Sequence, residues 1–347
     1  GILPILKTAT QTNSAQVRMY AARLIGQLKA IGAIDDLLRL FADSNTYVRG
    51  QAQSALIHIG VPSIERLIEV LDKKAVNIVP DRNSGFMSAS QFIATAYIDE
   101  DRRTSRRLDV QRTAIEALGI LDARQAIPQL IDLLDDDDLN GSAVSALTAM
   151  GTLTLPRLAS GKKNSEGNLI NSLINTMGDM GKSNQVRIRS VQILSNIGDL
   201  RAVEVLVNAL ETDPLKEIRA IAASAIGNMR ARGSTLEIQS VKALTKSLSD
   251  DNDTIVINAS KALGQLHVRY DKADQKLVWI AQDKGRRETV RREALNALMI
   301  LKPQHAIQPM LRIMFSDDTS PDLRRAAVKV LGEIGDDATN PPLIWAL

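Results

Sequence analysis

Apolar residues recur along the chain in a nine-residue pattern that is typical of an amphipathic α-helix. The first place of the pattern is an aliphatic residue and the second is usually Arg. Two variable positions, a small residue, two more variable positions and an aliphatic pair follow. The apolar places are the first, fifth, eighth and ninth, which line one stripe of a helix. The nine copies occupy residues 17–25, 48–56, 110–118, 139–147, 186–194, 218–226, 255–263, 290–298 and 323–331.

The copies recur at a nearly regular interval. Their first residues lie 29 to 37 positions apart, except at two longer steps of 62 and 47 residues. A weaker apolar pattern between the copies predicts a second helix in each unit, so that each unit is a hairpin of a helix A followed by the patterned helix B. Hairpins of this size cannot bury an apolar face alone and must stack. We therefore expect an all-α fold, a right-handed α-solenoid of about nine to ten stacked hairpins.

Glycines recur at the ends of the predicted B helices, and aspartates recur in the turns before them. Eight copies carry Gly one or four residues past the pattern, where a left-handed residue would end helix B. These glycines are Gly26, Gly60, Gly119, Gly151, Gly198, Gly227, Gly264, Gly332 and Gly335. Four aspartates lie five residues before the first place of a pattern copy. A carboxylate near the start of helix B interacts favourably with the helix dipole. The four aspartates are Asp43, Asp213, Asp250 and Asp318.

Together, the Val-Arg…Ala…Ala-Leu-Gly helix B, the acidic turn and the unit of about 30 residues resemble a known family. They are similar to the short HEAT-like repeats first recognised in phycobilisome lyases, and the resemblance covers nearly the whole chain. It implies that the Arg at the second place pairs with the turn Asp and stacks between neighbouring units. On this basis we interpret six arginines as structural: Arg18, Arg49, Arg187, Arg219, Arg291 and Arg324.

Two stretches interrupt the repeat within a single solenoid of residues 1–347. Residues 73–107 fit no copy, and we expect a non-repeat insertion that leaves the stack as a loop, with a short helix over 89–97, and rejoins it at Leu108. Residues 159–182 form an irregular repeat. Both ends of the chain run into repeat-like sequence instead of the polar caps of a solenoid, so we expect a piece of a longer protein.

Composition excludes several classes of site. The absence of cysteine removes disulfides and thiolate metal sites, and the three histidines have no metal-ligand spacing. Gly-Lys-Ser at 181–183 lacks the preceding Gly and strand of a phosphate-binding loop. We expect no cofactor, no metal and no catalytic residue. No apolar run reaches a membrane-spanning length. We expect a bacterial, cytoplasmic protein, with the cell envelope or periplasm as the alternative because the chain opens mid-pattern.

Positive charge gathers at three places of the pattern although the net charge is only +3. The third, fourth and seventh places point away from the apolar stripe. Their basic residues, which we call the ridge, are Arg23, Arg112, Arg189, Lys261, Arg292, Arg325 and Lys329, against Glu116 and Glu293 alone. We add the basic end of the insertion, Arg102, Arg103, Arg106 and Arg107, as further candidate partner-binding residues.

The ridge favours a non-catalytic scaffold that binds another protein with an acidic surface along its B helices. Binding to the nucleic-acid backbone is the alternative, and the two differ in salt dependence. A bilin-lyase-like enzyme or chaperone is a further alternative that the family resemblance implies. An alkylpurine-glycosylase-like enzyme would need an aromatic cluster, and the two tryptophans lie in different repeats.

Overall fold

A computed structural model describes residues 1–71, 100–152, 167–229, 235–267 and 270–335. These residues form helices joined by short turns, with no strand among them. They divide into two compact units, Gly1–Ser172 (unit 1) and Leu173–Leu347 (unit 2). The fold is all-α and of the solenoid type, as the pattern predicts.

Unit 1 alternates short A helices with longer B helices. The A helices are α1 (Leu3–Ala9), α3 (Ile34–Arg39), α5 (Ile64–Leu71) and α8 (Ile127–Asp132). Short 3-10 turns flank them at Ile31–Ala33, Leu40–Ala42, Val61–Ser63, Arg124–Ala126 and Leu133–Asp135. The B helices are α2 (Ala15–Gln27), α4 (Thr46–Ile59), α7 (Glu100–Ile120) and α9 (Asn140–Thr152).

Unit 2 repeats the same alternation after helix α11 (Gly167–Gly178), which crosses the boundary between the units. Its other A helices are α13 (Val203–Thr212), α15 (Thr235–Ser247), α17 (Asp271–Gln282) and α19 (Ile307–Phe315). Two 3-10 turns are Leu200–Ala202 and Gln304–Ala306. Its B helices are α12 (Asn184–Ile197), α14 (Lys216–Met229), α16 (Asp253–Leu266), α18 (Glu288–Leu301) and α20 (Pro321–Ile334).

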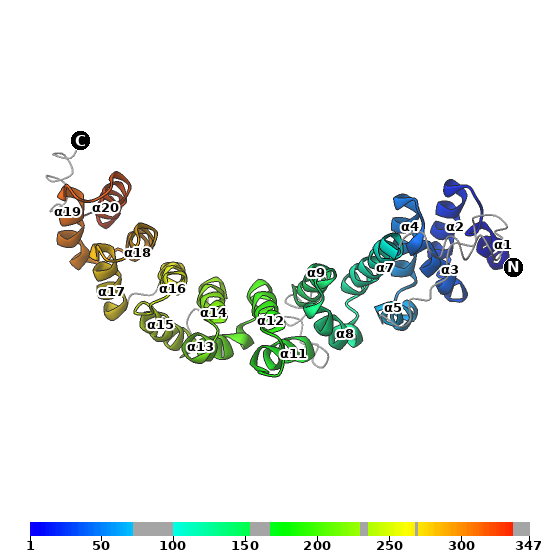
Figure 1. The fold of residues 1–347 in the computed structure, drawn as a ribbon, viewed down its shortest axis with the longest axis horizontal. Coiled ribbons are helices and arrows are strands. Elements are labelled where there is room, and N and C mark those ends of the chain that lie inside the picture. The colour runs from blue at the N-terminus through cyan, green and yellow to red at the C-terminus, as the bar shows by residue number, and fades with distance from the viewer. Residues whose placement is uncertain (72–99, 153–166, 230–234, 268–269, 336–347) are drawn as a thin grey trace. The chain divides into compact units, whose positions relative to one another are not determined.

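Within each unit the B helices form one layer and the A helices the other (Figure 1). The core lies between the layers, where the fifth place of the pattern is fully packed. The eight alanines at this place are at most 2% exposed, which confirms the predicted register: Ala21, Ala52, Ala114, Ala143, Ala222, Ala259, Ala294 and Ala327. Ser190 takes the place in α12, and its buried hydroxyl donates to the carbonyl of Val186 at 2.8 Å.

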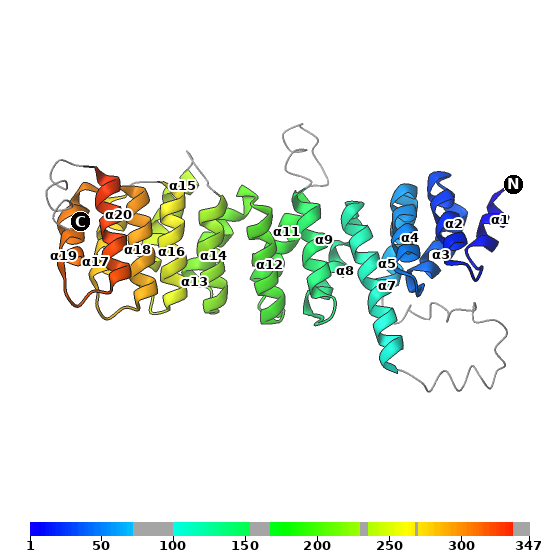
Figure 2. The same cartoon turned by 90° about the horizontal axis from the view of Figure 1, so that it is seen from above.

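Helix α7 is longer than the pattern predicts. It begins at Glu100 and not at Leu108, and its 21 residues extend past the ends of the neighbouring helices of unit 1 (Figure 2). The expected loop after residue 99 is therefore helical backbone. The rest of the insertion, including the expected short helix at 89–97, lies outside the described residues, as does the first part of the irregular repeat at 159–182. Its second part is α11.

Seven of the nine glycines after the pattern fall into two groups with different roles. Gly332 lies inside α20, and Gly151, expected to end its helix, lies inside α9 without a positive φ. Gly60, Gly198 and Gly335 have positive φ angles of 80°, 71° and 64° and cap their helices, as expected. The four glycines of the other group, each one residue past the pattern, lie inside helices instead. They allow two B helices to touch, because a Cβ there would lie within 3.3 Å of the next helix backbone. The four pairs are Gly26–Ala55, Gly119–Ala146, Gly227–Ala262 and Gly264–Ala297.

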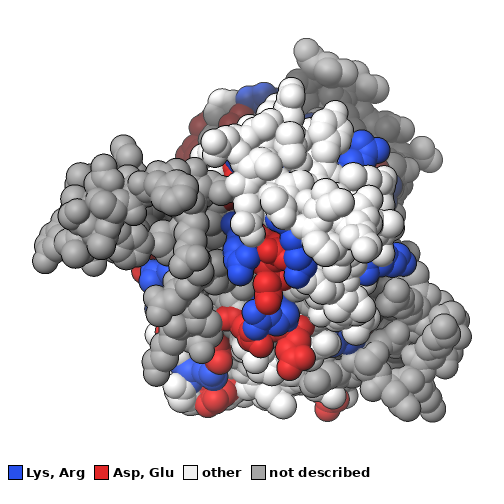
Figure 3. Space-filling model, turned by 90° about the vertical axis from the view of Figure 1, so that its right-hand side faces the viewer, with Lys and Arg blue, Asp and Glu red and all other residues white. Residues whose placement is uncertain are grey.

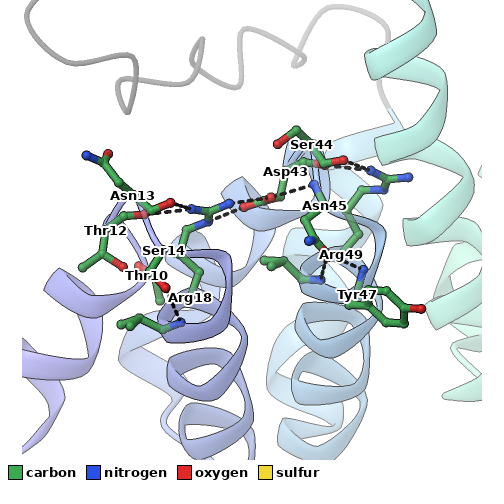
Figure 4. Close-up of polar contacts among 12 residues, drawn as sticks. Thr10, Thr12, Asn13, Ser14, Arg18, Asp43, Ser44, Asn45, Tyr47 and Arg49 are labelled. Atoms are coloured by element: carbon green, nitrogen blue, oxygen red, sulfur yellow. Dashed lines mark hydrogen bonds and ion pairs between the residues drawn. The ribbon is translucent and has the colours of Figure 1, made fainter.

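Arg18 and Asp43 join the first two hairpins (Figure 4). Two nitrogens of the Arg18 guanidinium donate to the Asp43 carboxylate at 2.6 and 2.9 Å. The same carboxylate accepts the backbone N–H of Asn45, the N-cap residue of α4, at 2.9 Å. Arg49 donates to the carbonyl oxygen of Asp43 at 2.7 Å. One aspartate therefore holds the arginines of two successive B helices.

The same arrangement recurs in unit 2 and then changes. Arg187 pairs with Asp213, and Arg219 donates to the Asp213 carbonyl at 3.0 Å and reaches Asp250 at 3.4 Å. These contacts support the structural interpretation of the second-place arginines. Arg291 instead donates to the Ala281 carbonyl at 3.0 Å, and Asp318 pairs with Lys284. The ion pair with Lys284 and a hydrogen bond from Ser316 lower the pKa of Asp318 to about 2.

Candidate functional site: a basic groove between helices α18 and α20

Three ridge residues of unit 2 line one groove. Arg292 and Asn296 of α18 face Asp322, Arg325, Ala326 and Lys329 of α20 across a hollow of about 210 Å³. The groove forms because α18 and α20 are neighbouring B helices whose third and seventh places border the same furrow. Sequence spacing alone places these residues on two helices; the stacking of the hairpins brings them together.

The groove carries more positive than negative charge. Arg292, Arg325 and Lys329 are all exposed, and Asp322 is the single carboxylate among the lining residues. Arg325 pairs with Asp322 within the first turn of α20. Among the described residues, neither Arg292 nor Lys329 has an ion-pair or hydrogen-bond partner. Two cations are thus available to an anionic group, and a third is held by a carboxylate that a ligand would compete with.

Asn296 adds a polar group to the lining of the groove. Its side-chain amide donates to the Glu293 carboxylate at 3.2 Å. The sequence interpretation missed Asn296 and Asp322 because it considered basic residues only. Asn296 occupies the seventh place, the same place as Lys261 and Lys329. The pattern therefore predicts that its side chain points away from the apolar stripe, as theirs do.

The other ridge residues of unit 2 lie on separate B helices. Lys261 is exposed on α16, the neighbour of α18. Arg189 is half-buried on α12 and is engaged in contacts within the protein. The groove therefore includes three of the five ridge residues in unit 2.

In unit 1 the two ridge residues differ in their surroundings. Arg23 is exposed on α2. Arg112 is half-buried on α7 and donates to the carbonyl of Asp138 at 3.1 Å, in the turn before the next B helix. Through this contact Arg112 joins two neighbouring hairpins. The charge pattern could not predict the contact, because the sequence does not distinguish a basic residue that faces solvent from one that donates to a carbonyl.

The four arginines at the end of the insertion lie on the first turns of α7. The side chains of Arg102, Arg103 and Arg106 are outside the described part of the structure. Arg107 is half-buried, and its Nε atom is enclosed without a hydrogen-bond partner among the described residues. Arg107 therefore differs from the solvent-exposed residue that a loop would present.

A second hollow, of about 390 Å³, lies on the A-helix side of unit 2. It is lined by α13 and α15 and carries mixed charge: Glu204, Val207, Asn208, Glu211, Gln239, Lys242 and Ala243. Lys246 pairs with Glu211 at its edge, at 3.4 Å. The charges of this hollow compensate one another, whereas those of the α18–α20 groove do not.

Two other features are not found in the part of the chain that the structure describes. In the described ranges, no three His, Cys, Asp or Glu side chains are grouped so that they could hold a metal ion. None of the described helices combines the length and the apolar character needed to span a bilayer. The lining of the α18–α20 groove has an excess of positive charge, which is chemically suited to anionic groups.

Models of two protein families match this sequence. The model described as HEAT repeats matches residues 2–81, 170–264 and 203–298, which together make up more than half of the chain. The model described as PBS lyase HEAT-like repeat matches residues 110–136 and 323–347. A comparison with curated protein sequences found no match.

Several solved structures are similar in fold. Kap121p has a TM-score of 0.60 and 13% identity over 96% of this chain, which spans only 37% of the Kap121p chain. Kap121p bound to Nup53p has a TM-score of 0.57 and 12% identity over the same shares. The complex of CpcE and CpcF of phycocyanin lyase from Nostoc has a TM-score of 0.40 and 22% identity over 50% of this chain and 98% of that chain.

Proposed function

Because the chain belongs to the HEAT-repeat family, we propose that it is a non-catalytic scaffold that binds an acidic segment of another protein in the α18–α20 groove. The observation that carries this proposal is the convergence of Arg292, Arg325 and Lys329 on one furrow with a single carboxylate, Asp322. Carboxylates of a partner would be attracted by this excess of positive charge and would meet guanidinium groups able to donate two parallel hydrogen bonds.

The size and openness of the groove favour a segment over a small metabolite. Its volume of about 210 Å³ is below the roughly 300–1,000 Å³ of pockets that enclose a ligand. An acidic side chain or two of a longer chain would fit, with further contacts along the B-helix layer, where Lys261 is exposed on α16. Kap121p, which shares the fold, is described as bound to the protein Nup53p, and this is consistent with a protein partner.

Binding of a fluorescein-labelled peptide of alternating Glu and Gly residues tests the proposal. The double variant Arg292→Glu, Arg325→Glu should lower the affinity of this peptide at least tenfold. The matched control is Lys242→Glu, Lys246→Glu, which changes the net charge equally but lies on α15 outside the groove. Unchanged affinity in the groove variant, or equal losses in both variants, would contradict the proposal.

A salt titration separates a protein partner from nucleic acid. Binding to DNA phosphates should weaken steeply with salt, with a slope that counts the neutralised phosphates. We expect labelled single-stranded and duplex DNA to bind more weakly than the acidic peptide at 150 mM salt, and to lose no affinity in the groove variant beyond the loss in the control. Tighter binding of DNA that depends on Arg292 and Arg325 would make nucleic acid the partner.

A further inference from the structure

Asparagine and glutamine side chains recur across the B helices of unit 2. They occupy the seventh place of the pattern and the place two residues past its end, which lie one turn apart on the same side of each helix. Five of the ten residues at these two places in unit 2 are amides, which we call the amide row: Gln192, Asn196, Asn228, Gln265 and Asn296. Among the eight residues at the same places in unit 1, Gln27 alone is an amide.

The stacking of the hairpins joins the amide row into one surface. Helices α12, α14, α16 and α18 contact one another in order and stand side by side in one layer (Figure 1). Gln265 of α16 donates to the side-chain oxygen of Asn228 of α14 at 3.4 Å, so amides of neighbouring helices meet. Gln192 and Asn196 are exposed and have no side-chain hydrogen bond among the described residues. Asn296 also lines the α18–α20 groove, which makes the two surfaces continuous.

The charge of this surface changes from one end to the other. At α16, α18 and α20 it carries Lys261 together with the cations of the groove, all of them exposed. At α12 and α14 the two places hold amides and Ser224, and the neighbouring Arg189 is half-buried and engaged in contacts within the protein. A bound carboxylate would therefore meet exposed cations at the first end and only uncharged groups at the two places of the second.

Unit 1 differs in its charge arrangement. Figure 3 views the structure from the end at which unit 1 begins, and acidic and basic side chains lie next to one another there. Asp36 binds Lys7 at 3.4 Å and Arg39 at 2.9 Å, and Asp35 binds Arg66 at 2.7 Å. Charges that compensate one another in this way attract an acidic segment little, which favours unit 2 as the place of binding.

An amide side chain is suited to a peptide backbone. Its N–H groups and its carbonyl oxygen match the carbonyl and the N–H of a peptide group. An extended chain leaves these backbone groups available, whereas a helix has already bonded them internally. The amide row therefore favours an extended segment over a helical one, and it favours uncharged side chains on the part of the segment that it binds.

We propose that the partner's segment crosses unit 2 as an extended chain of about twelve residues, with an acidic half at α16–α20 and an uncharged half on the amides of α12 and α14. Packed helices lie roughly 8–10 Å apart and an extended chain advances about 3.3 Å per residue, so each step between B helices takes about three residues. From α12 to α20 there are four such steps. The acidic half occupies the α18–α20 groove, so this inference rests on the proposed function.

Labelled peptides of two lengths measure the contribution of the uncharged half. The short peptide has about six residues of alternating Glu and Gly, enough to reach from α16 to α20. The long peptide adds about six residues of alternating Ser and Gly, at the N-terminus in one version and at the C-terminus in the other. The better of the two long peptides should bind at least about fivefold more tightly than the short one, the gain expected from one net hydrogen bond. No gain from either version would overturn the proposal.

The double variant Asn196→Ala, Asn228→Ala should remove this gain and leave the affinity of the short peptide unchanged. Both side chains are exposed, so the helical circular dichroism should also stay unchanged. The matched control is Asn208→Ala, Gln239→Ala, which removes two exposed amides on the A-helix side of unit 2. A gain that survives in the first variant, or that both variants lose equally, would show that the amide row does not bind the segment.

A third peptide tests the backbone contact. N-methylglycine in place of Gly in the added half removes backbone N–H donors, and the peptide should lose most of the gain. An undiminished gain would refute backbone recognition. Failure of the proposed function would look different, because the short peptide would then bind without depending on Arg292 and Arg325. A short peptide that needs both arginines, combined with no gain from the added half, would refute the extended path alone.

Discussion

Gly227 of α14 lies so close to Ala262 of α16 that a Cβ at residue 227 would be 2.6 Å from the Ala262 Cα atom. The side-chain oxygen of Gln265 would be equally close. Since real Cβ atoms do not approach a backbone carbon this closely, even alanine would force the two helices apart.

Gly227→Ala should therefore destabilise the protein by about 1–3 kcal/mol, although alanine favours a helix over glycine by roughly 1 kcal/mol. Gly332→Ala is the matched control, because Gly332 holds the same place on α20 and no described residue lies within 4 Å of a Cβ at that position. That change should stabilise the protein slightly. Urea denaturation of both variants measures the difference, and equal effects of the two substitutions would show that the close approach has no energetic weight.

The ion pair between Arg187 and Asp213 should be far more important than its surface counterparts. Both side chains are buried, at 2% and 7% exposed. Asp213→Ala would leave the guanidinium charge enclosed without its carboxylate, and we expect a loss of about 3–5 kcal/mol. Arg66 pairs with Asp35 on the surface, both about half exposed, and Arg66→Ala should cost at most about 1 kcal/mol. Thermal and chemical denaturation that ranked the two variants in the opposite order would contradict this.

Removing the carboxylate of the groove should strengthen binding. Asp322 engages Arg325, so Asp322→Asn would release this guanidinium and raise the net positive charge of the groove. We expect the acidic peptide to bind several-fold more tightly, mainly through faster association. The helix itself should lose only about 0.3–1 kcal/mol, because an acidic residue in the first turn of α20 is replaced by a neutral one. Stopped-flow association rates provide the measurement, and a slower rate would be evidence against a partner of negative charge.

Asp199 gives a pH-dependent contribution to stability. Burial raises the pKa of its carboxyl, but hydrogen bonds from the side chain and the backbone N–H of Arg201, together with the nearby charge, outweigh burial and hold the pKa below its ordinary value. A depressed pKa in the folded state means that this stabilisation is present above the unfolded-state pKa of about 3.9 and is lost as the pH falls through the folded-state pKa.

Asp199→Asn should accordingly cost about 1 kcal/mol at pH 7 and progressively less below pH 4. Urea denaturation of the two proteins at pH 7, 5 and 3 follows the difference. A cost that stayed constant over this range would mean that the contribution of Asp199 does not depend on its charge.

The sequence predicts the fold well because the buried stripe of helix B imposes a repeated choice of residues. Ala222 and its equivalents must be small wherever two hairpins meet, and this requirement is visible without coordinates. The start of α7 at Glu100 could not be found in the same way. Apolar periodicity detects only the part of a helix that packs against another element, and the first turns of α7 project past their neighbours with a charged sequence.

The glycines and the groove show a second limit. Gly26 and Gly60 both follow the pattern, yet one permits a helix contact and the other takes a positive φ. Their offsets, one residue or four, distinguish the two roles only once the helix lengths are known. For the ridge, a place in the pattern gives the direction of a side chain relative to its own helix. It does not say whether the next turn supplies a carbonyl, as at Arg112, or a second cation across a furrow, as at Arg292.

The two-layer stacking also has a mechanical consequence. The helices from α13 to α20 make their main contacts with their hairpin partners and with the matching helices of the adjoining hairpins. A force that pulls on the ends of such a stack acts on all the interfaces in series, so every interface between hairpins bears the same force. The interface with the least buried area yields first, and the remaining hairpins stay folded because their contacts are local. The stack would therefore lengthen in steps of one hairpin and recoil when the load is removed.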